Sequence, residues 1–186
     1  MAVTTLDPKT ALVVIDLQNG ILSYPTIHPV GEVVRHASAL ADAFRSHGLP
    51  VVLVIAAGRA PGRTEQARSH GELPAGFTDL LPELNQQPQD HTVTKSTPGA
   101  FTNTDLEAHL RKLQITQVVV AGVATSNGVE ATARHAYELG FNVTLASDCM
   151  TDLSTEVHVN SITRIFPKLG EIGTAQDIID LLARRD

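Results

Sequence analysis

Short runs of aliphatic residues recur along the chain, and longer stretches with helical spacing lie between them. The hydrophobicity of each run is continuous rather than alternating, which is typical of a strand that is covered on both faces. The runs are residues 11–15, 51–57, 91–94, 117–123, 141–146 and, more weakly, 171–173. Since parallel strands are usually covered on both faces, the pattern predicts a six-stranded parallel sheet.

Helical stretches separate and follow these runs, with apolar residues at three-and-four spacing. Their ends carry ordinary signals: Gly48 and Gly140 follow two of them, and Thr104 and Thr174 are candidate N-caps. The expected helices are residues 30–47, 104–113, 126–139 and about 174–183. Strand alternating with helix predicts an α/β fold, a single-domain, doubly wound, Rossmann-like sheet with helices on both faces, spanning residues 1–186. Two long connections, 58–70 and 71–89, are expected to be loops and candidate lids.

Composition narrows the class of protein. The 186 residues suit one domain, and the 14 Lys and Arg against 20 Asp and Glu give a net charge of −6 with no block of like charge. Five Phe, two Tyr and no Trp leave few rings for stacking on bases, so we expect no nucleic-acid partner. No apolar run approaches the ~20 residues that span a bilayer, so we expect no membrane partner. A single cysteine and a start without a secretory pattern favour a cytoplasmic protein.

Polar residues stand at three predicted strand ends, where ligands of parallel α/β sheets gather. Asp16 follows the first strand, Lys95 closes the third, and residues 122–128 turn the fourth strand into a helix. The amides of that turn suit a carboxylate or a developing oxyanion. Each place also has a structural interpretation: Asp16 accepting loop amides, Lys95 in solvent, and Thr125 or Ser126 capping the helix.

Four motifs extend these segments over nearly the whole chain. They are Thr10-Ala-Leu-Val-Val-Ile-Asp-Leu-Gln-Asn19, Lys95 with Thr97-Pro-Gly-Ala-Phe101, Gly122-Val-Ala-Thr125 leading into Val129-Glu-Ala-Thr-Ala-Arg134, and Gly140-Phe-Asn-Val-Thr-Leu-Ala-Ser-Asp148. In this order and spacing they resemble the isochorismatase-like hydrolases, a superfamily that includes nicotinamidases and N-carbamoylsarcosine amidases.

The resemblance implies catalytic roles for Asp16 and Lys95, because the cysteine hydrolases of this superfamily use an Asp, a Lys and a Cys. Their Cys stands three residues after the Thr of the Gly-Val-Ala-Thr motif, and here that position is Gly128. Glycine has no nucleophile, so covalent thioacyl chemistry at this position is excluded. Family isochorismatases also carry Gly there and cleave a vinyl ether without a covalent intermediate. The motif often contains a non-proline cis peptide, which would map to Val123–Ala124.

We therefore expect a water-dependent hydrolysis of a small molecule, by vinyl ether or C–N bond cleavage. Asp16 would transfer the proton, Lys95 would orient the substrate and stabilise charge, and the amides around Gly128 would bind a polar group or water. The expected substrate-binding residues are Gln18, Phe101, Ala124, Thr125 and Asn127. One tension remains: the Lys95 ammonium favours an ionised Asp16, which suits a base, whereas protonation of a vinyl ether needs an acid.

No metal and no cofactor are expected. Nicotinamidases hold a divalent ion with Asp and His residues after the second strand, but residues 57–63 offer no such cluster and His70 stands alone. Arg59 and Arg63 are candidates for holding an anionic substrate, or are exposed solubilising residues. By analogy with the family we expect a homo-oligomer, a dimer or tetramer, with the helix 126–139 at an interface.

Two other functions stay open. The first is a catalytically inactive binding or scaffold paralogue that has lost the nucleophile and kept the fold. The second is an amidase that uses Cys149, which follows the fifth predicted strand at the same sheet edge; the alternative is that Cys149 is a small apolar filler.

Overall fold

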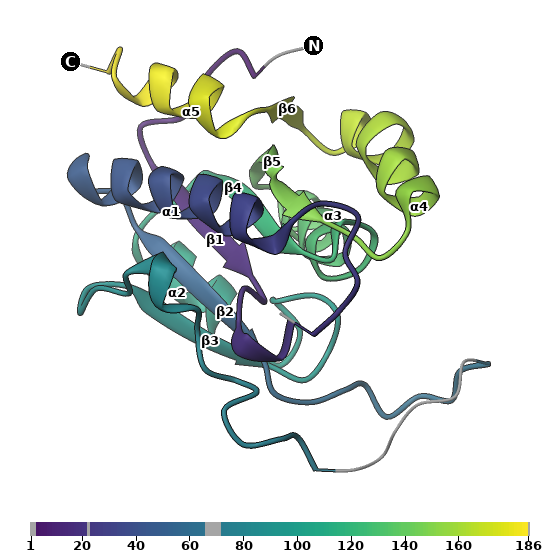
Figure 1. The fold of residues 1–186 in the computed structure, drawn as a ribbon. Helices are drawn as coiled ribbons and strands as arrows, with labels where there is room; N and C mark the ends of the chain where they lie inside the picture. Colours follow the sequence, from purple (N-terminus) through teal and green to yellow (C-terminus); the bar gives the residue numbers. More distant parts are fainter. Residues whose placement is uncertain (1–2, 22, 66–71, 186) are drawn as a thin grey trace.

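A six-stranded parallel sheet forms the centre of the molecule (Figure 1). The computed structural model describes residues 3–21, 23–65 and 72–185. The strand order is β3-β2-β1-β4-β5-β6, and every neighbouring pair is parallel. The strands are β1 (Thr10–Ile15), β2 (Val51–Ala56), β3 (His91–Lys95), β4 (Gln117–Val123), β5 (Asn142–Thr151) and β6 (Glu171–Gly173). The predicted doubly wound α/β sheet is confirmed.

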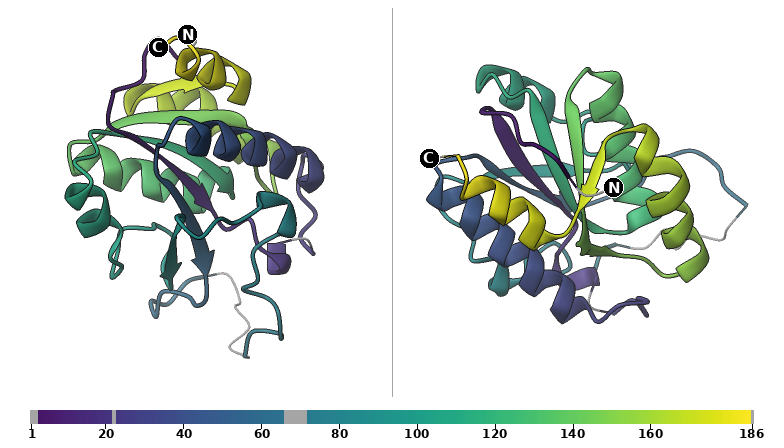
Figure 2. Two further views of the ribbon diagram at one scale, coloured as in Figure 1. Left: turned by 90° about the vertical axis from the view of Figure 1, so that its left-hand side faces the viewer. Right: turned by 90° about the horizontal axis from the view of Figure 1, so that it is seen from above.

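Helices cover both faces of the sheet. They are α1 (Val30–Ser46), α2 (Leu106–Lys112), α3 (Glu130–Glu138), α4 (Thr155–Asn160) and α5 (Ala175–Leu182). Helices α1 and α5 lie side by side on one face (Figure 2), while α2 and α3 pack on the other. Successive residues of β1 enter opposite layers, since Leu12 and Val14 belong to the α1 side and Val13 and Ile15 to the other. This explains the unbroken apolar run, because a strand buried on both faces has no polar side.

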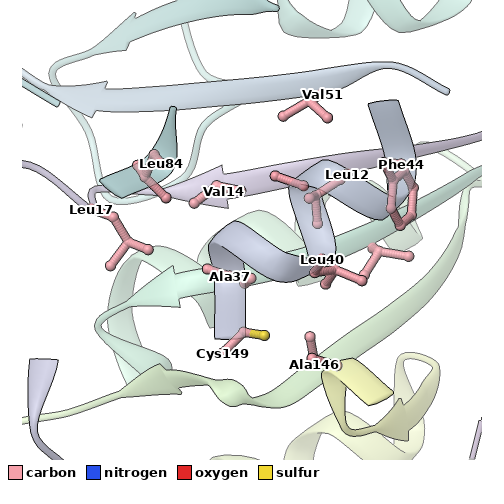
Figure 3. Close-up of a cluster of buried hydrophobic side chains, with 14 of the residues drawn as sticks. Leu12, Val14, Leu17, Ala37, Leu40, Phe44, Val51, Leu84, Ala146 and Cys149 are labelled. Carbon is pink, nitrogen blue, oxygen red and sulfur yellow. The ribbon is translucent and has the colours of Figure 1, made fainter. Parts of the chain in front are cut away.

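The α1 layer is closely filled with aliphatic side chains (Figure 3). Leu40 and Phe44 of α1 are fully buried, and they occur at the helical spacing that the sequence shows. Cys149 belongs to the same cluster as Ala37 and Ala146 (Figure 3), and it is fully buried. The cysteine is therefore part of the hydrophobic core in this structure.

Three segments differ from the sequence-based expectation. Strand β5 runs to Thr151 instead of ending at residue 146, because an irregularity in its pairing with β4 lets Gly122 align with Met150. The expected helix 126–139 begins as a π-helical turn, η3 (Thr125–Val129), before α3. Helix α4 was not expected at all; it buries no apolar residue, so its sequence has no amphipathic pattern to find.

The structure describes part of each of the two long connections. Residues 66–70 of the expected loop 58–70, and residue 71 of the next, lie outside the described residues. The second connection contains a short 3-10 turn, η2 (Pro82–Leu84), and Leu80 forms a bridge with Gln18. Among the helices that the structure describes, none is both long and apolar enough to cross a membrane.

Candidate active site

Asp16 and Lys95 meet at the carboxyl edge of the sheet, although their strands are separated by β2. Asp16 follows β1, and Lys95 is the last residue of β3. The Lys95 Nζ atom lies 2.8 Å from Asp16 Oδ2 and donates a hydrogen bond to it. Both residues are buried, with 7% of Asp16 and 4% of Lys95 exposed. The structure thus brings together two residues that are 79 positions apart in sequence.

Burial controls the charge of Asp16. It raises the pKa of this carboxyl from 3.8 to about 6, although the charge of Lys95 and its hydrogen bond act in the opposite direction. The Oδ1 atom is buried and has no hydrogen-bond partner among the residues that the structure describes. A buried polar atom without a partner is costly, so such an atom calls for an explanation, such as a bound water or ligand or a catalytic role. The Asp16 backbone is also unusual, with φ of 54°, in the left-handed region.

Lys95 has one donor to spare. Its ammonium bonds to Asp16 Oδ2 and, at 3.2 Å, to the carbonyl oxygen of Thr97. An ammonium has three hydrogens, and no partner for the third is found within the described part of the chain. Lys95 can therefore donate to a bound ligand while it keeps its contact with Asp16.

The turn after β4 comes close to Asp16 at Gly128. A Cβ atom placed on Gly128 would lie 3.4 Å from Asp16 Oδ2, so position 128 faces the carboxylate directly. The peptide Val123–Ala124 is cis, as the family resemblance implies. Gly122 has φ of 116°, and a Cβ there would overlap the carbonyl oxygen of Ile15. Only glycine fits this position, where the backbones of β1 and β4 approach each other.

Thr125, Ala124 and Asn127, the other site residues predicted at this turn, differ in burial and in hydrogen bonding. Thr125 is fully buried, and its hydroxyl bonds to the carbonyl oxygen of Thr151 at 3.0 Å and contacts His158 Nδ1 at 2.8 Å. The carbonyl of Ala124 accepts from the amides of Asn127 and Val129 and so closes the turn. The Asn127 side chain is exposed. Any contact of Thr125 with a ligand would therefore come from its backbone, since its hydroxyl is already engaged.

Gln18 and Phe101 have structural partners in this structure. The Gln18 amide donates to the carbonyl oxygens of Ala56 and Phe77 and accepts from the Ala56 amide. It therefore joins the end of β2 to the long connection, and no N–H of its amide is left over. The ring of Phe101 packs against Phe141 and His135 in the α3 layer. Neither side chain has a hydrogen bond to the Asp16 carboxylate, although the Gln18 backbone amide donates to the carbonyl oxygen of Asp16 at 3.0 Å.

Sequence reasoning missed the residues that hold the turn from behind. Asp152 Oδ2 accepts a hydrogen bond from the Ser126 amide at 2.7 Å, and His158 contacts the Thr125 hydroxyl. Asp152 follows the unexpected extension of β5, and His158 lies on the unexpected helix α4. A strand β5 that continues to Thr151 would have pointed to these two residues. The sequence shows no sign of that continuation, because Ser147-Asp-Cys-Met-Thr151 is not an apolar run.

Cys149 is separated from this chemistry. Burial, together with the neighbouring Asp148, raises the pKa of its thiol well above the ordinary value. A thiol in such surroundings stays protonated, whereas the thiolate is the nucleophile. Cys149 is thus a core residue whose surroundings favour the protonated thiol.

The described residues contain no group of three or more His, Cys, Asp and Glu side chains that could hold a metal ion. His70 lies outside the described residues. Arg59 and Arg63 are exposed on the connection that follows β2.

Comparisons with known proteins agree on one family. A family model described as an isochorismatase domain matches residues 10–177. The uncharacterized isochorismatase family protein YwoC of Bacillus subtilis strain 168 is 39% identical over 179 residues, covering 92% of this chain and 93% of the relative. The similarly described YecD of Escherichia coli O157:H7 is 40% identical over 182 residues, covering 93% and 96%. The structure of an isochorismatase family protein from Burkholderia thailandensis superposes with a TM-score of 0.92 at 42% identity, covering 96% of this chain and 98% of that one.

More distant relatives have names that state an activity, and these are hydrolases. Nicotinamidase 3 of Arabidopsis thaliana and the ureidoacrylate amidohydrolase RutB of Pantoea ananatis are each 29% identical to this chain.

Proposed function

The chain belongs to the isochorismatase family of hydrolases, and from this premise we propose that it hydrolyses a small molecule without a covalent intermediate, with Asp16 as the proton-transfer group. The observation that carries the proposal is the buried, unpartnered Oδ1 of Asp16, on a carboxyl whose pKa is about 6. Position 128 beside it holds glycine, which offers no nucleophile and so supports water in that role.

The two oxygens of Asp16 have different tasks. Lys95 occupies Oδ2, which leaves Oδ1 to exchange a proton with substrate or water. With a pKa of about 6, roughly a tenth of the molecules carry the proton at pH 7 and roughly nine tenths at pH 5. The direction of this pKa supports an acid role beside the Lys95 charge, since burial outweighs the attraction of the ammonium. Asp16 is suited to give or to take a proton near neutral pH.

Two bond cleavages fit these groups. For a vinyl ether, Asp16 gives its proton to the terminal vinylic carbon, water adds to the oxocarbenium ion and returns a proton to Asp16, and the hemiketal collapses to a carbonyl compound and an alcohol. For a C–N bond, the Asp16 carboxylate takes a proton from the attacking water and passes it to the leaving nitrogen. In the second case the free N–H of Lys95 would stabilise the developing oxyanion.

Turnover of a panel of vinyl ethers, amides and carbamoyl compounds tests the proposal. We expect the Asp16→Asn variant to lose turnover by a factor of roughly 100 or more while binding changes little. The exposed Asp180 on α5 provides a matched control, and Asp180→Asn should leave turnover unchanged. Full turnover by Asp16→Asn would refute the role of Asp16.

The pH profile separates the two reactions. For an acid role, kcat/KM falls as the pH rises through about 6, because the protonated carboxyl is lost. For a base role, kcat/KM rises over the same interval.

A second candidate is a binding paralogue without activity. It is favoured by the missing nucleophile at Gly128, and one relative, from Arabidopsis thaliana, is described as a probable inactive nicotinamidase at 28% identity. Binding of panel compounds without turnover of any would support this candidate. An amidase that uses Cys149 is disfavoured by the burial of the thiol; under the main proposal Cys149→Ala keeps full activity.

The proposal includes a homo-oligomer, a dimer or tetramer. Helix α3 exposes Tyr137, of which 54% is accessible, on the segment predicted to lie at an interface. Sedimentation equilibrium of the protein and of Tyr137→Ser tests this, and a monomer at every concentration would refute it.

A further inference from the structure

The hydroxyl of Thr125 determines how its neighbours are protonated. A threonine hydroxyl has one hydrogen to donate and lone pairs to accept. Here it lies 3.0 Å from the carbonyl oxygen of Thr151, which can only accept, and 2.8 Å from Nδ1 of His158. The single hydrogen therefore goes to Thr151, and His158 Nδ1 has to be the donor in the second bond. The contacts assign the Nδ1–H form to His158.

His158 connects helix α4 to the turn that carries Gly128. The structure describes all six residues of α4, and His158 is the one that is not exposed. The same ring meets His28 edge to face, with ring centres 5.0 Å apart, and lines a cavity of about 300 Å³ together with Glu32, His36 and Asp148. Helix α4 buries no apolar side chain, and His158 gives it a polar contact with the turn.

We infer that His158 is a positioning residue, whose Nδ1–H fixes the Thr125 hydroxyl and thereby holds the turn Thr125–Val129 with Gly128 against Asp16. The inference rests on the proposed function, because it assigns His158 to the same site. The turn has a second polar attachment behind it, from Asp152 to the Ser126 amide. Without the contact from His158, the Thr125 hydroxyl keeps only its bond to the carbonyl oxygen of Thr151 among the described residues.

Loosening the turn has a consequence at Asp16 that needs no substrate. Gly128 packs beside Asp16 Oδ2 and helps to keep the carboxyl buried. If the turn moves away, water reaches Asp16, the cost of its charge falls, and its pKa moves down toward the ordinary value. The titration of Asp16 therefore reports on the position of the turn.

Two variants of His158 distinguish the effect of its hydrogen bond to Thr125 from the effect of its side-chain volume. Asparagine carries an N–H close to the place of Nδ1, whereas leucine fills a similar volume without a donor. We expect His158→Leu to lower the Asp16 pKa by ~0.5 unit or more and His158→Asn to keep it near 6, measured from the ¹³C shift of the Asp16 carboxyl in labelled protein. The exposed His47 at the end of α1 is the control, and His47→Leu should change nothing.

The same variants are compared in turnover of any panel substrate. A misplaced turn should reduce kcat roughly 10- to 100-fold in His158→Leu with little change in KM, and His158→Asn should recover most of the loss. Equal values of the Asp16 pKa for the wild type, His158→Leu and His158→Asn would overturn the inference. So would an equal loss in both His158 variants, which would indicate a need for the imidazole itself.

The assignment of Nδ1–H has its own measurement. The ¹⁵N shifts of the His158 ring distinguish the two neutral forms, and we expect Nδ1–H in the wild type and a mixture in Thr125→Val. An Nε2–H ring in the wild type would overturn the inference. These results do not depend on turnover, so a failure of the proposed hydrolysis, seen as full activity of Asp16→Asn, remains distinguishable from a failure here.

Discussion

Replacement of Lys95 by methionine should raise the pKa of Asp16 above its value of about 6. Lys95 lowers this pKa through its charge and through the 2.8 Å hydrogen bond to Oδ2, while burial raises it. Methionine keeps the long unbranched side chain but removes both effects of the ammonium. Burial then acts unopposed, and the neutral form of the carboxyl is favoured further.

The magnitude follows from the two opposing effects. The rise from 3.8 to about 6 corresponds to about 3 kcal/mol against the ionised form, at 1.36 kcal/mol per unit. A hydrogen bond to a charged group contributes roughly 1.5–3 kcal/mol, which is about 1–2 units of pKa. We therefore expect the Asp16 pKa of Lys95→Met at roughly 7–8.

The ¹³C shift of the Asp16 carboxyl, followed from pH 4 to pH 9, measures this without a substrate. Lys112→Met is the control, because Lys112 is exposed at the end of α2. Circular dichroism establishes that each variant is folded over this range. An unchanged or lower Asp16 pKa in folded Lys95→Met would refute the conclusion that burial and Lys95 oppose each other at this carboxyl.

Three further predictions concern the surroundings of the site. Gly128→Ala places a methyl group 2.9 Å from the γ-methyl of Ile15, so we expect the free energy of unfolding, measured in urea, to fall by roughly 1–3 kcal/mol. Gly31→Ala is the control and should cost nothing, because no atom lies within 4 Å of the added methyl group. Equal effects of the two substitutions would contradict the packing argument. The pKa of Asp16 in the folded protein lies above its ordinary value of 3.8, so this group stabilises the fold below about pH 4, and the contribution is lost as the pH rises through 6. Asp16→Asn should therefore remove this part of the pH dependence of the free energy of unfolding. Cys149 should resist alkylation in the native protein and react fully in denaturant, as mass spectrometry would show; rapid native labelling would argue against its burial.

The fold could be predicted where burial leaves a direct trace in the sequence. Strand β1 is buried on both faces, so its run is purely apolar, and α1 shows its buried stripe in the spacing of Val33, Ala37 and Leu40. The end of β5 and helix α4 leave no such trace. The first depends on an irregular pairing with β4, and the second buries no apolar side chain.

The candidate site was predictable to a similar degree. Strand ends and motif order indicated Asp16, Lys95 and Gly128, and the structure brings these three together. The protonation of Asp16 could not be predicted, because a neighbouring ammonium and burial have opposite effects on a carboxyl. Only the structure shows how little water reaches the pair, and that decides the sign.

The packing around Gly128 helps to distinguish a site that is shaped around glycine from one that has simply lost a cysteine side chain. A Cβ there would lie 2.9 Å from the γ-methyl of Ile15 and 3.2 Å from the carbonyl oxygen of Val123. Ile15 is fully buried, and the methyl is attached to its Cβ, so it has little freedom to move. Simple loss of a side chain would have left space behind, but here the neighbours have closed on the glycine. The packing therefore favours a site shaped around Gly128, in agreement with the proposal that water is the nucleophile.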